Sequence, residues 1–407
     1  MECILPGRVL VAPQEHYVEE FTQDISKEIG LPFSFDYSIE DILLRYDLPV
    51  KLDELRKRFG PLPRVGRVPE GHEGTAAERL RKIGHIKAAC PDFAVRPHFS
   101  GLKVNQSVID DAIAYVGAQS QATSCGDNCT IGVLDTGVDG SVLTNQGALS
   151  WVQYDVDNPL DKGGAPSDAM GHGSLVAYII NCIAPSARII SIKTITDTGS
   201  ISGVLAGLYL SSVVGPCDLL NLSLSVSCDS TQCPHCSQPI LASANAAQLE
   251  FLFQRFISGA GDCAIIAAAG NGYSHVAMPA SFPNIIAVGD FDFRAQTPSP
   301  NSNYHDVPVD RYILAPGARP SQRESFGNLP GHKNAFPMWG TSFATAIVTG
   351  VAARYVCGLR GGQCSKAVKP SGVSLFEHLR DNFKNTAKKK WSNYDPQKHG
   401  LGAVNFP

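Results

Sequence analysis

Six short apolar runs follow one another along the chain after about residue 105. They are rich in Ile, Val, Leu and Ala and cover residues 130–135, 187–195, 217–225, 263–271, 283–291 and 311–317. Stretches with helical character lie between several of them, such as 202–214 and 246–259. Near-continuous apolar strands that alternate with helices indicate a parallel sheet covered on both faces. We therefore expect a three-layer α/β domain, with its chemistry just beyond the carboxyl ends of the strands.

The first hundred residues have a different pattern. Residues 7–13 and 92–98 resemble strands, while 15–30 and 75–89 have helical periodicity. This order predicts a small α+β domain over residues 1–102, followed by the α/β domain over 103–407. A basic stretch at 51–69 lies in the smaller domain, and we interpret it as a solvated helix face, with an acidic partner as the alternative.

Composition limits the classes of function. The 407 residues are 43% apolar and 18% charged, which is typical of a globular protein. The net charge of −4 gives no indication of nucleic acid or an anionic membrane as a partner. The first residues lack a basic segment followed by an apolar core, and we see no run long enough for a bilayer. These features predict a soluble, cytoplasmic protein without a membrane or nucleic-acid partner.

Four polar residues stand where the predicted strands end or helices begin: Asp135, His172, Asn271 and Ser342. A serine hydroxyl needs a base to become a nucleophile, and histidine titrates near neutral pH. A buried carboxylate fixes the histidine tautomer, and an amide donor stabilises an oxyanion. Each residue alone also has a structural interpretation. Asp135 and Asn271 could be turn residues, His172 a buried structural histidine and Ser342 a helix cap. Their combination and order favour catalysis.

The motifs VLDTGVD, GHGSLVA and GTSFATAIVTG resemble those of the subtilisin-like serine protease family, peptidase S8, over roughly residues 105–407. The resemblance implies that Asp135 orients His172, that His172 is the base and that Ser342 is the nucleophile. It also implies that Asn271 and the Ser342 main-chain N–H hold the oxyanion, and that the chemistry needs no cofactor. Two departures are conservative: Ala346 replaces a common proline and Ser174 replaces a threonine.

The resemblance also implies a cleft for an extended peptide substrate. Two strand edges and one pocket would form it, with the residues Gly199, Ser200, Ile201, Ser202, Gly203, Ser223, Leu224, Ser225, Ala268, Ala269, Gly270 and Ala277. Ser225 and Ala277 stand where the family often has glycine, which predicts a shallow pocket.

The sequence bears on two kinds of metal site, for calcium and for zinc. The segment after His172 is short, so we do not expect the calcium-binding loop that many family members carry there. An insertion at 226–239 contains Cys228, Cys233, His235 and Cys236, with Cys263 as a possible further ligand. Zinc, a disulfide and free thiols remain alternatives for this insertion, and we expect it near the cleft. For the close pair Cys125 and Cys129 we expect a structural role.

These observations together predict a serine endopeptidase that acts through an acyl-enzyme. The N-terminal domain resembles the family's prodomain in layout, which predicts an intramolecular inhibitor and folding aid that is cleaved near 98–108. The alternatives are a permanent docking domain, a dedicated intracellular processing peptidase for one precursor or effector, and an inactive scaffold.

Overall fold

The computed structural model describes most of the chain. The described residues are 4–14, 25–44, 52–95, 103–119, 125–139, 151–156, 168, 170–195, 199–226, 244–272, 275–304, 309–319, 323–329, 336–362, 371–389 and 391–406.

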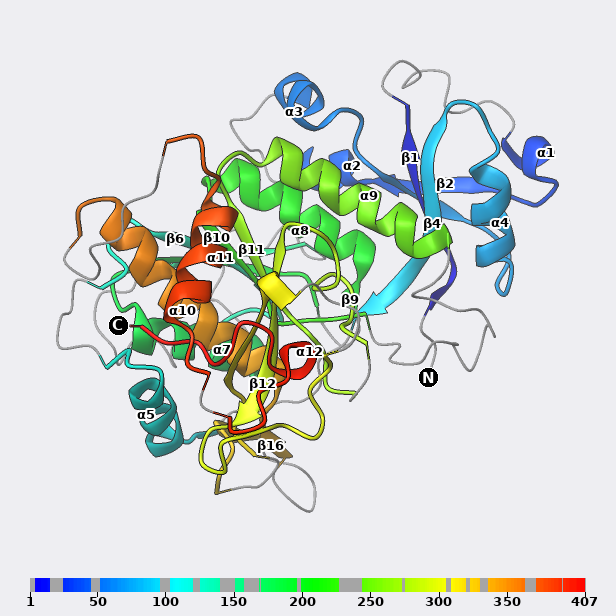
Figure 1. Ribbon diagram of the computed structural model, residues 1–407. Helices are drawn as coiled ribbons and strands as arrows, with labels where there is room; N and C mark the ends of the chain where they lie inside the picture. Colours follow the sequence, from blue (N-terminus) through cyan, green and yellow to red (C-terminus); the bar gives the residue numbers. More distant parts are fainter. Residues whose placement is uncertain are drawn as a thin grey trace.

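A mostly parallel eight-stranded sheet forms the centre of the larger part (Figure 1). Its order is β13-β12-β11-β10-β6-β8-β7, with β14 paired to β12, and only β13 runs antiparallel to its neighbour. The bounds are β6 Thr130–Asp135, β7 Trp151–Asp155, β8 Arg188–Lys193, β10 Leu219–Leu222, β11 Ala264–Ala268, β12 Ile285–Asp292, β13 Thr297–Pro298 and β14 Tyr312–Pro316. The six predicted apolar strands are all present.

Helices cover both faces of this sheet, as the alternating pattern predicts (Figure 1). One layer contains α7 (His172–Ile183) and α10 (Thr341–Leu359), which pack on each other. The other contains α8 (Ile201–Val214) and α9 (Ala244–Gly259). The remaining elements are α5 Gln106–Tyr115, η2 Val309–Arg311, α11 Leu375–Thr386, α12 Pro396–His399, and a small sheet of β5 Lys103–Val104, β15 Gly327–Leu329 and β16 Phe336–Met338.

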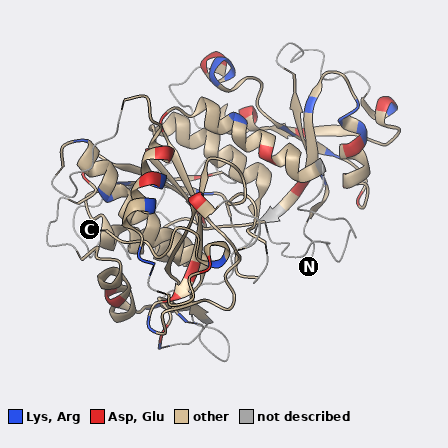
Figure 2. Cartoon of the chain, in the orientation of Figure 1, with Lys and Arg blue, Asp and Glu red and all other residues tan. Residues whose placement is uncertain are grey.

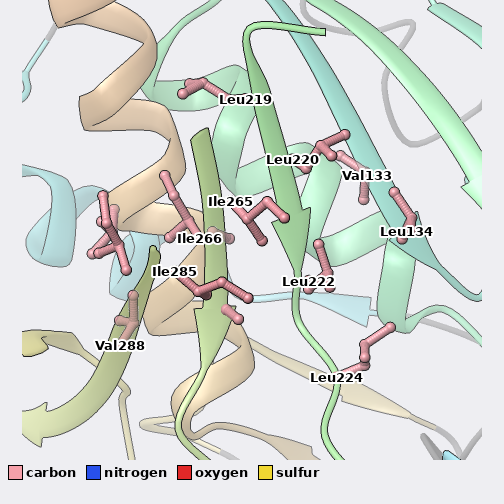
Figure 3. Close-up of a cluster of buried hydrophobic side chains, with 14 of the residues drawn as sticks. Val133, Leu134, Leu219, Leu220, Leu222, Leu224, Ile265, Ile266, Ile285 and Val288 are labelled. Carbon is pink, nitrogen blue, oxygen red and sulfur yellow. The ribbon is translucent and has the colours of Figure 1, made fainter. Parts of the chain in front are cut away.

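The core lies between these layers. Val133, Leu220 and Ile266 come from neighbouring parallel strands and are completely buried. Figure 3 shows their side chains gathered with those of adjacent strands. Burial of each such side chain contributes roughly 1.5–3 kcal/mol. The packed core therefore fixes the strand ends on which the candidate site is built.

A separate antiparallel sheet forms in the N-terminal part, with the order β2-β3-β1-β4-β9. Its elements are β1 Ile4–Pro13, α1 Ile25–Ile29, β2 Ser34–Ser38, α2 Ile39–Leu44, α3 Leu52–Phe59, β3 Arg64–Arg67, α4 Glu73–Leu80, β4 Ile86–Val95 and β9 Gly199–Ser200. The sheet packs through β4 on α8 and α9. Strand β9 comes from the larger part of the chain, so one sheet joins the two parts.

One of the two helix predictions in this region is wrong in part, and the other is only partly testable. The expected helix at 75–89 is wrong in its second half, because α4 ends at Leu80 and Ile86 begins β4. Tertiary pairing decides this: Ala88, Ala89 and Cys90 pair with β1, which outweighs the helical propensity of alanine. Of the expected helix at 15–30, α1 covers only 25–29, and residues 15–24 lie outside the described residues. The domain division at 102/103 remains a prediction.

Helix α10 differs from our expectation that no segment could span a bilayer. Among the described residues, it alone is long and apolar enough, with 19 residues and a hydropathy of 1.4. However, 83% of it is buried inside the molecule, where it packs against β10, β11, β12, β14 and α7. In this fold its apolar surface forms the core.

Candidate active site

The end of β6 and the start of α7 bring two predicted residues together. The Nδ1 atom of His172 lies 2.7 Å from Oδ1 of Asp135, and only 1% of Asp135 is exposed. The same oxygen accepts a hydrogen bond from the main-chain N–H of Thr136, and the Thr136 hydroxyl accepts one from Gly173. A Cβ at Gly173 would lie 2.2 Å from the carbonyl oxygen of Gly137, so glycine permits this close approach. The local motifs thus fix a carboxylate–imidazole pair.

The electrostatics of this pair favour the protonated imidazole. Burial by itself lowers the pKa of His172, but the charge of Asp135 and its hydrogen bond raise it, and Asp168 adds to the increase. The net result is a pKa above the ordinary value of about 6.5. A carboxylate that stabilises imidazolium in this way suits a histidine that accepts a proton during a reaction.

Asp168 is a residue of this site that the sequence analysis did not identify. Its Oδ1 accepts hydrogen bonds from the main-chain N–H groups of Met170 and Gly171, at 3.0 and 2.8 Å. Its Oδ2 accepts from the N–H and hydroxyl of Ser174, at 2.8 and 2.6 Å. Asp168 therefore caps the first turn of α7, the helix that begins with His172. The signal in the sequence is an aspartate four residues before a histidine at a helix start.

Ser342 lies in the first turn of α10, next in the chain to a residue that contacts His172. The ring of the next residue, Phe343, lies 5.2 Å from the imidazole, measured between centroids. In this structure the Ser342 hydroxyl donates to the carbonyl oxygen of Ser223 at 3.0 Å and not to His172. Rotation about the Cα–Cβ bond of Ser342 redirects the hydroxyl, and catalytic hydrogen bonds commonly tighten only when substrate binds.

Asn271 is held against the same helix start. Its Oδ1 accepts from the main-chain N–H and hydroxyl of Thr341, at 3.0 and 3.1 Å. Asn271 thus provides an acceptor for one of the main-chain N–H groups that a helix start leaves unpaired. Oδ1 is thus occupied, whereas no hydrogen bond from Nδ2 occurs among the described residues. Gly340 allows this contact, since a Cβ there would lie 2.7 Å from Oδ1 of Asn271.

The predicted cleft residues fall into two groups. Gly199 and Ser200 form the short strand β9 and offer an extended edge. The prediction that 201–203 continue this edge is wrong: Ile201, Ser202 and Gly203 form the first turn of α8. The Ser200 hydroxyl caps this turn by accepting from the N–H of Gly203 at 2.9 Å, which ends the strand. Ile201 and Ser202 are completely buried.

The other predicted edge and the pocket lie next to Ser342. The Ser223 hydroxyl is 2.7 Å from the carbonyl oxygen of Ser342, and Leu224 and Ser225 follow it. The remaining pocket residues are all buried. They lie at the end of β11 or on the segment that is hydrogen-bonded to it: Ala268, Ala269, Gly270 and Ala277. The Ala277 N–H donates to the carbonyl oxygen of Ala269 at 2.8 Å, which closes one wall.

The zinc candidates Cys228, Cys233, His235 and Cys236 lie outside the described residues. Cys263 is described, and burial raises its pKa well above the ordinary value, so its thiol is protonated. Cys125 and Cys129 are free thiols. No group of three or more His, Cys, Asp or Glu that could hold a metal occurs in the described part of the chain.

Comparison with known proteins identifies the class. The model of the Subtilase family, Peptidase S8, matches residues 126–402, which contain all four candidate catalytic residues. The chain therefore belongs to the subtilase family of serine peptidases.

Among similar proteins, the Thermophilic serine proteinase of Bacillus sp. (strain AK1) is 30% identical over 235 residues. That alignment covers 55% of this chain and 51% of the relative, so the chain matches about half of that protein's length. Alkaline elastase YaB of Bacillus sp. (strain YaB) is 26% identical over 69% of this chain and 70% of its own length.

A solved structure supports the fold. Fervidolysin from Fervidobacterium pennivorans, a keratinolytic enzyme related to subtilisin, superposes with a TM-score of 0.63 at 17% identity. The superposition covers 99% of this chain and 60% of that one. A lanthipeptide protease superposes with a TM-score of 0.56 at 17% identity, covering 73% of this chain and 93% of its own.

Proposed function

We propose that the chain is a serine endopeptidase whose catalytic residues are Asp135, His172, Ser342 and Asn271. The observation that carries the proposal is the buried 2.7 Å Asp135–His172 contact beside the helix start that presents Ser342. In this mechanism Nε2 of His172 removes the Ser342 hydroxyl proton while Oγ attacks the peptide carbonyl carbon. Asn271 Nδ2 and the Ser342 N–H donate to the oxyanion.

The remaining steps use the same groups. The tetrahedral intermediate collapses when protonated His172 gives its proton to the leaving amine. Water, deprotonated by His172, then attacks the acyl carbon and releases the second product, which restores the Ser342 hydroxyl. No step needs a metal or a cofactor.

We further propose that the N-terminal part inhibits this site. Ala94 and Val95, at the end of β4, pair antiparallel with Ser200 and Gly199 of β9. This is the edge to which an extended substrate would add as a strand. While β4 lies there, a substrate cannot form the same main-chain hydrogen bonds.

A buried polar network supports this arrangement. Asp92 of β4 is completely buried and accepts from the Ser202 N–H and hydroxyl at 3.1 and 2.8 Å. Arg8 of β1 forms an ion pair with Asp92 at 2.7 Å. The carboxylate therefore caps α8 of the catalytic part from the N-terminal part, which ties the two together.

Cleavage of the precursor would follow β4 in the chain. Of the predicted region 98–108, residues 98–102 lie outside the described residues, while 103–104 form β5 and 106–108 begin α5. A helix does not fit a cleft that binds extended chain, so we place the proposed cut before α5.

The test is intact mass after reaction with a fluorophosphonate probe. We expect one adduct on the wild type, none on Ser342→Ala, and one on the control Ser107→Ala, whose serine is exposed on α5. Wild type shortened by roughly the first hundred residues, with Ser342→Ala at full length, would support self-cleavage. An adduct on Ser342→Ala would contradict the assignment of the nucleophile.

A further inference from the structure

A groove of about 930 Å³ lies between the N-terminal part and α9. Helix α3 and the residues after it form one wall, and the α9 residues Phe251, Arg255 and Gly259 form the other. Pro13 of β1 and Lys87 of β4 close one end. Its volume is in the upper part of the ~300–1,000 Å³ range of ligand sites. Neither part of the chain forms this groove alone.

Among the described residues, all charged ones that line the groove are cations: Arg56, Lys57, Arg58, Lys87 and Arg255. Blue segments on α3 and α9 in Figure 2 show two sources of this charge. Arg56 is neutralised by Glu40, at 2.8 Å. Lys57, Arg58 and Lys87 have no carboxylate partner among the described residues. The groove is therefore positive, although the whole chain has a net charge of −4.

Neutral contacts across the interface hold two of these cations. Nε of Arg58 donates to the carbonyl oxygen of Gly259, and Nε of Arg255 donates to that of Phe59. Because a carbonyl group carries no net charge, the contact with Gly259 positions the Arg58 guanidinium without cancelling its charge. Lys57 and Lys87 are exposed. An incoming anion would meet the guanidinium of Arg58 and these two ammonium groups together.

A partly exposed aromatic ring lies beside one of the cations. Nζ of Lys87 is 5.9 Å from the ring centroid of Phe251, whereas the ring of Phe59 is buried against Tyr209 and Phe256. Small inorganic anions gain nothing from such a ring, whereas a peptide with apolar side chains among its carboxylates gains from both surfaces.

The groove is distant from the catalytic residues. It contains Lys87 near the start of β4, whereas the contact with β9 is at the other end of this ten-residue strand. At about 3.3 Å per residue the two ends of β4 are roughly 30 Å apart. A ligand in the groove would therefore not occupy the substrate cleft.

We propose that this groove binds an extended, acidic peptide segment of another protein. Carboxylates of the segment pair with Lys57, Lys87 and Arg58, and its apolar side chains lie on Phe251.

The proposal has a regulatory consequence, which rests on the proposed inhibitory role of the N-terminal part. A ligand that needs both walls binds only while the two parts remain together. By linkage, it stabilises the associated state and delays release of the N-terminal part.

Fluorescence anisotropy with the full-length Ser342→Ala chain tests the binding directly, because this variant should not cut the probe. The probe is a labelled peptide of Glu, Asp and Leu, and its matched control replaces Glu and Asp by Gln and Asn. We expect binding of the acidic probe only, weakened at least tenfold between about 50 and 300 mM salt. This readout does not depend on catalysis, so its failure is distinguishable from failure of the proposed activity.

Charge reversal locates the site. Lys57→Glu with Lys87→Glu should weaken binding at least tenfold. The control Lys384→Glu with Lys389→Glu changes the net charge equally at exposed positions of the C-terminal part and should change binding less than twofold. Equal losses in the two double variants, no binding of the acidic probe at low salt, or tighter binding of single-stranded RNA would each overturn the proposal.

Discussion

At the residue scale, the candidate site depends on buried ionisable side chains. Asp135 and His172 form a buried pair, and Asp168 adds a second carboxylate close to the same imidazole. The protonation of these groups, rather than their presence alone, decides when the site can act.

The pH dependence of the reaction follows from His172. Only the neutral imidazole can accept the Ser342 proton, and the pKa of His172 is raised. For the mature enzyme, kcat/KM should therefore rise with pH through a midpoint above about 6.5. A pH profile with a small fluorogenic peptide measures this midpoint, and a midpoint below the ordinary histidine value would contradict the electrostatics.

Asp168→Asn should move that midpoint to lower pH. The substitution keeps one acceptor oxygen for the N–H groups of Met170 and Gly171, loses the acceptor for the Ser174 N–H, and removes a negative charge that raises the pKa of His172. The control is Asp110→Asn, on the exposed side of α5, which should leave the profile unchanged. If Asp168→Asn lowers kcat/KM equally at every pH, the residue has only a structural role.

The burial of Asp290 leads to a prediction about how the stability of the protein depends on pH. It is completely buried in β12, and burial raises its pKa to about 6, although the hydroxyls of Ser299 and Ser302 offset part of the increase. A carboxyl with a raised folded-state pKa favours folding when protonated, so stability decreases as pH rises from about 4 to 6.

Asp290→Asn removes the free-energy cost of ionising a buried carboxyl group. We expect the free energy of unfolding at pH 8 to increase by up to about 3 kcal/mol, with little change near pH 4. Urea unfolding of both proteins in the Ser342→Ala background measures the difference. A gain of equal size at both pH values would show that ionisation of Asp290 is not the cause.

At the element scale, hydrogen bonds from the side chain of Arg311 stabilise the pocket segment that carries Ala277. Arg311, at the end of η2, donates to the carbonyl oxygens of Ala280, Ser281 and Ile285, at 2.6 to 3.1 Å. Three carbonyl groups, two of the pocket segment and one at the start of β12, thus converge on one buried guanidinium.

Arg311→Met should lower the free energy of unfolding by about 3 kcal/mol, because buried carbonyl groups lose their donors. It should also raise KM, since the pocket wall is less well ordered. The control Arg294→Met removes surface ion pairs with Asp111 and Glu324 and a cation–π contact with Phe293, and should cost less than about 1 kcal/mol. Chemical unfolding and steady-state kinetics measure the two effects.

At the scale of the whole molecule, the association of the two parts depends on Asp92, which is buried between Arg8 and α8. Asp92→Ala removes the carboxylate that pairs with Arg8 and accepts from Ser202, so the N-terminal part should leave at least tenfold faster after cleavage. The rate at which peptidase activity appears in purified precursor measures this release. Arg67→Ala, which breaks an exposed pair with Asp36, is the control, and equal rates for the two variants would contradict the role of Asp92.

The sequence by itself determined the elements whose signal is local. Six apolar runs gave the strands, because a strand buried on both faces must be apolar along its length. Short motifs also placed Asp135, His172, Asn271 and Ser342 at strand ends and helix starts, where such residues are presented to a cleft. The family's sequence order connected them to one chemistry.

Only the tertiary structure decided the features that depend on contacts between distant segments. Residues 86–89 resemble helix but form a strand, because β1 offers them a partner. Residues 201–203 begin a helix because Ser200 caps it. The β4–β9 pairing, the Asp92 network and the basic groove all join residues of the first hundred to residues beyond 198. Periodicity and propensity describe neighbours along the chain, so they contain no information about which distant surfaces meet.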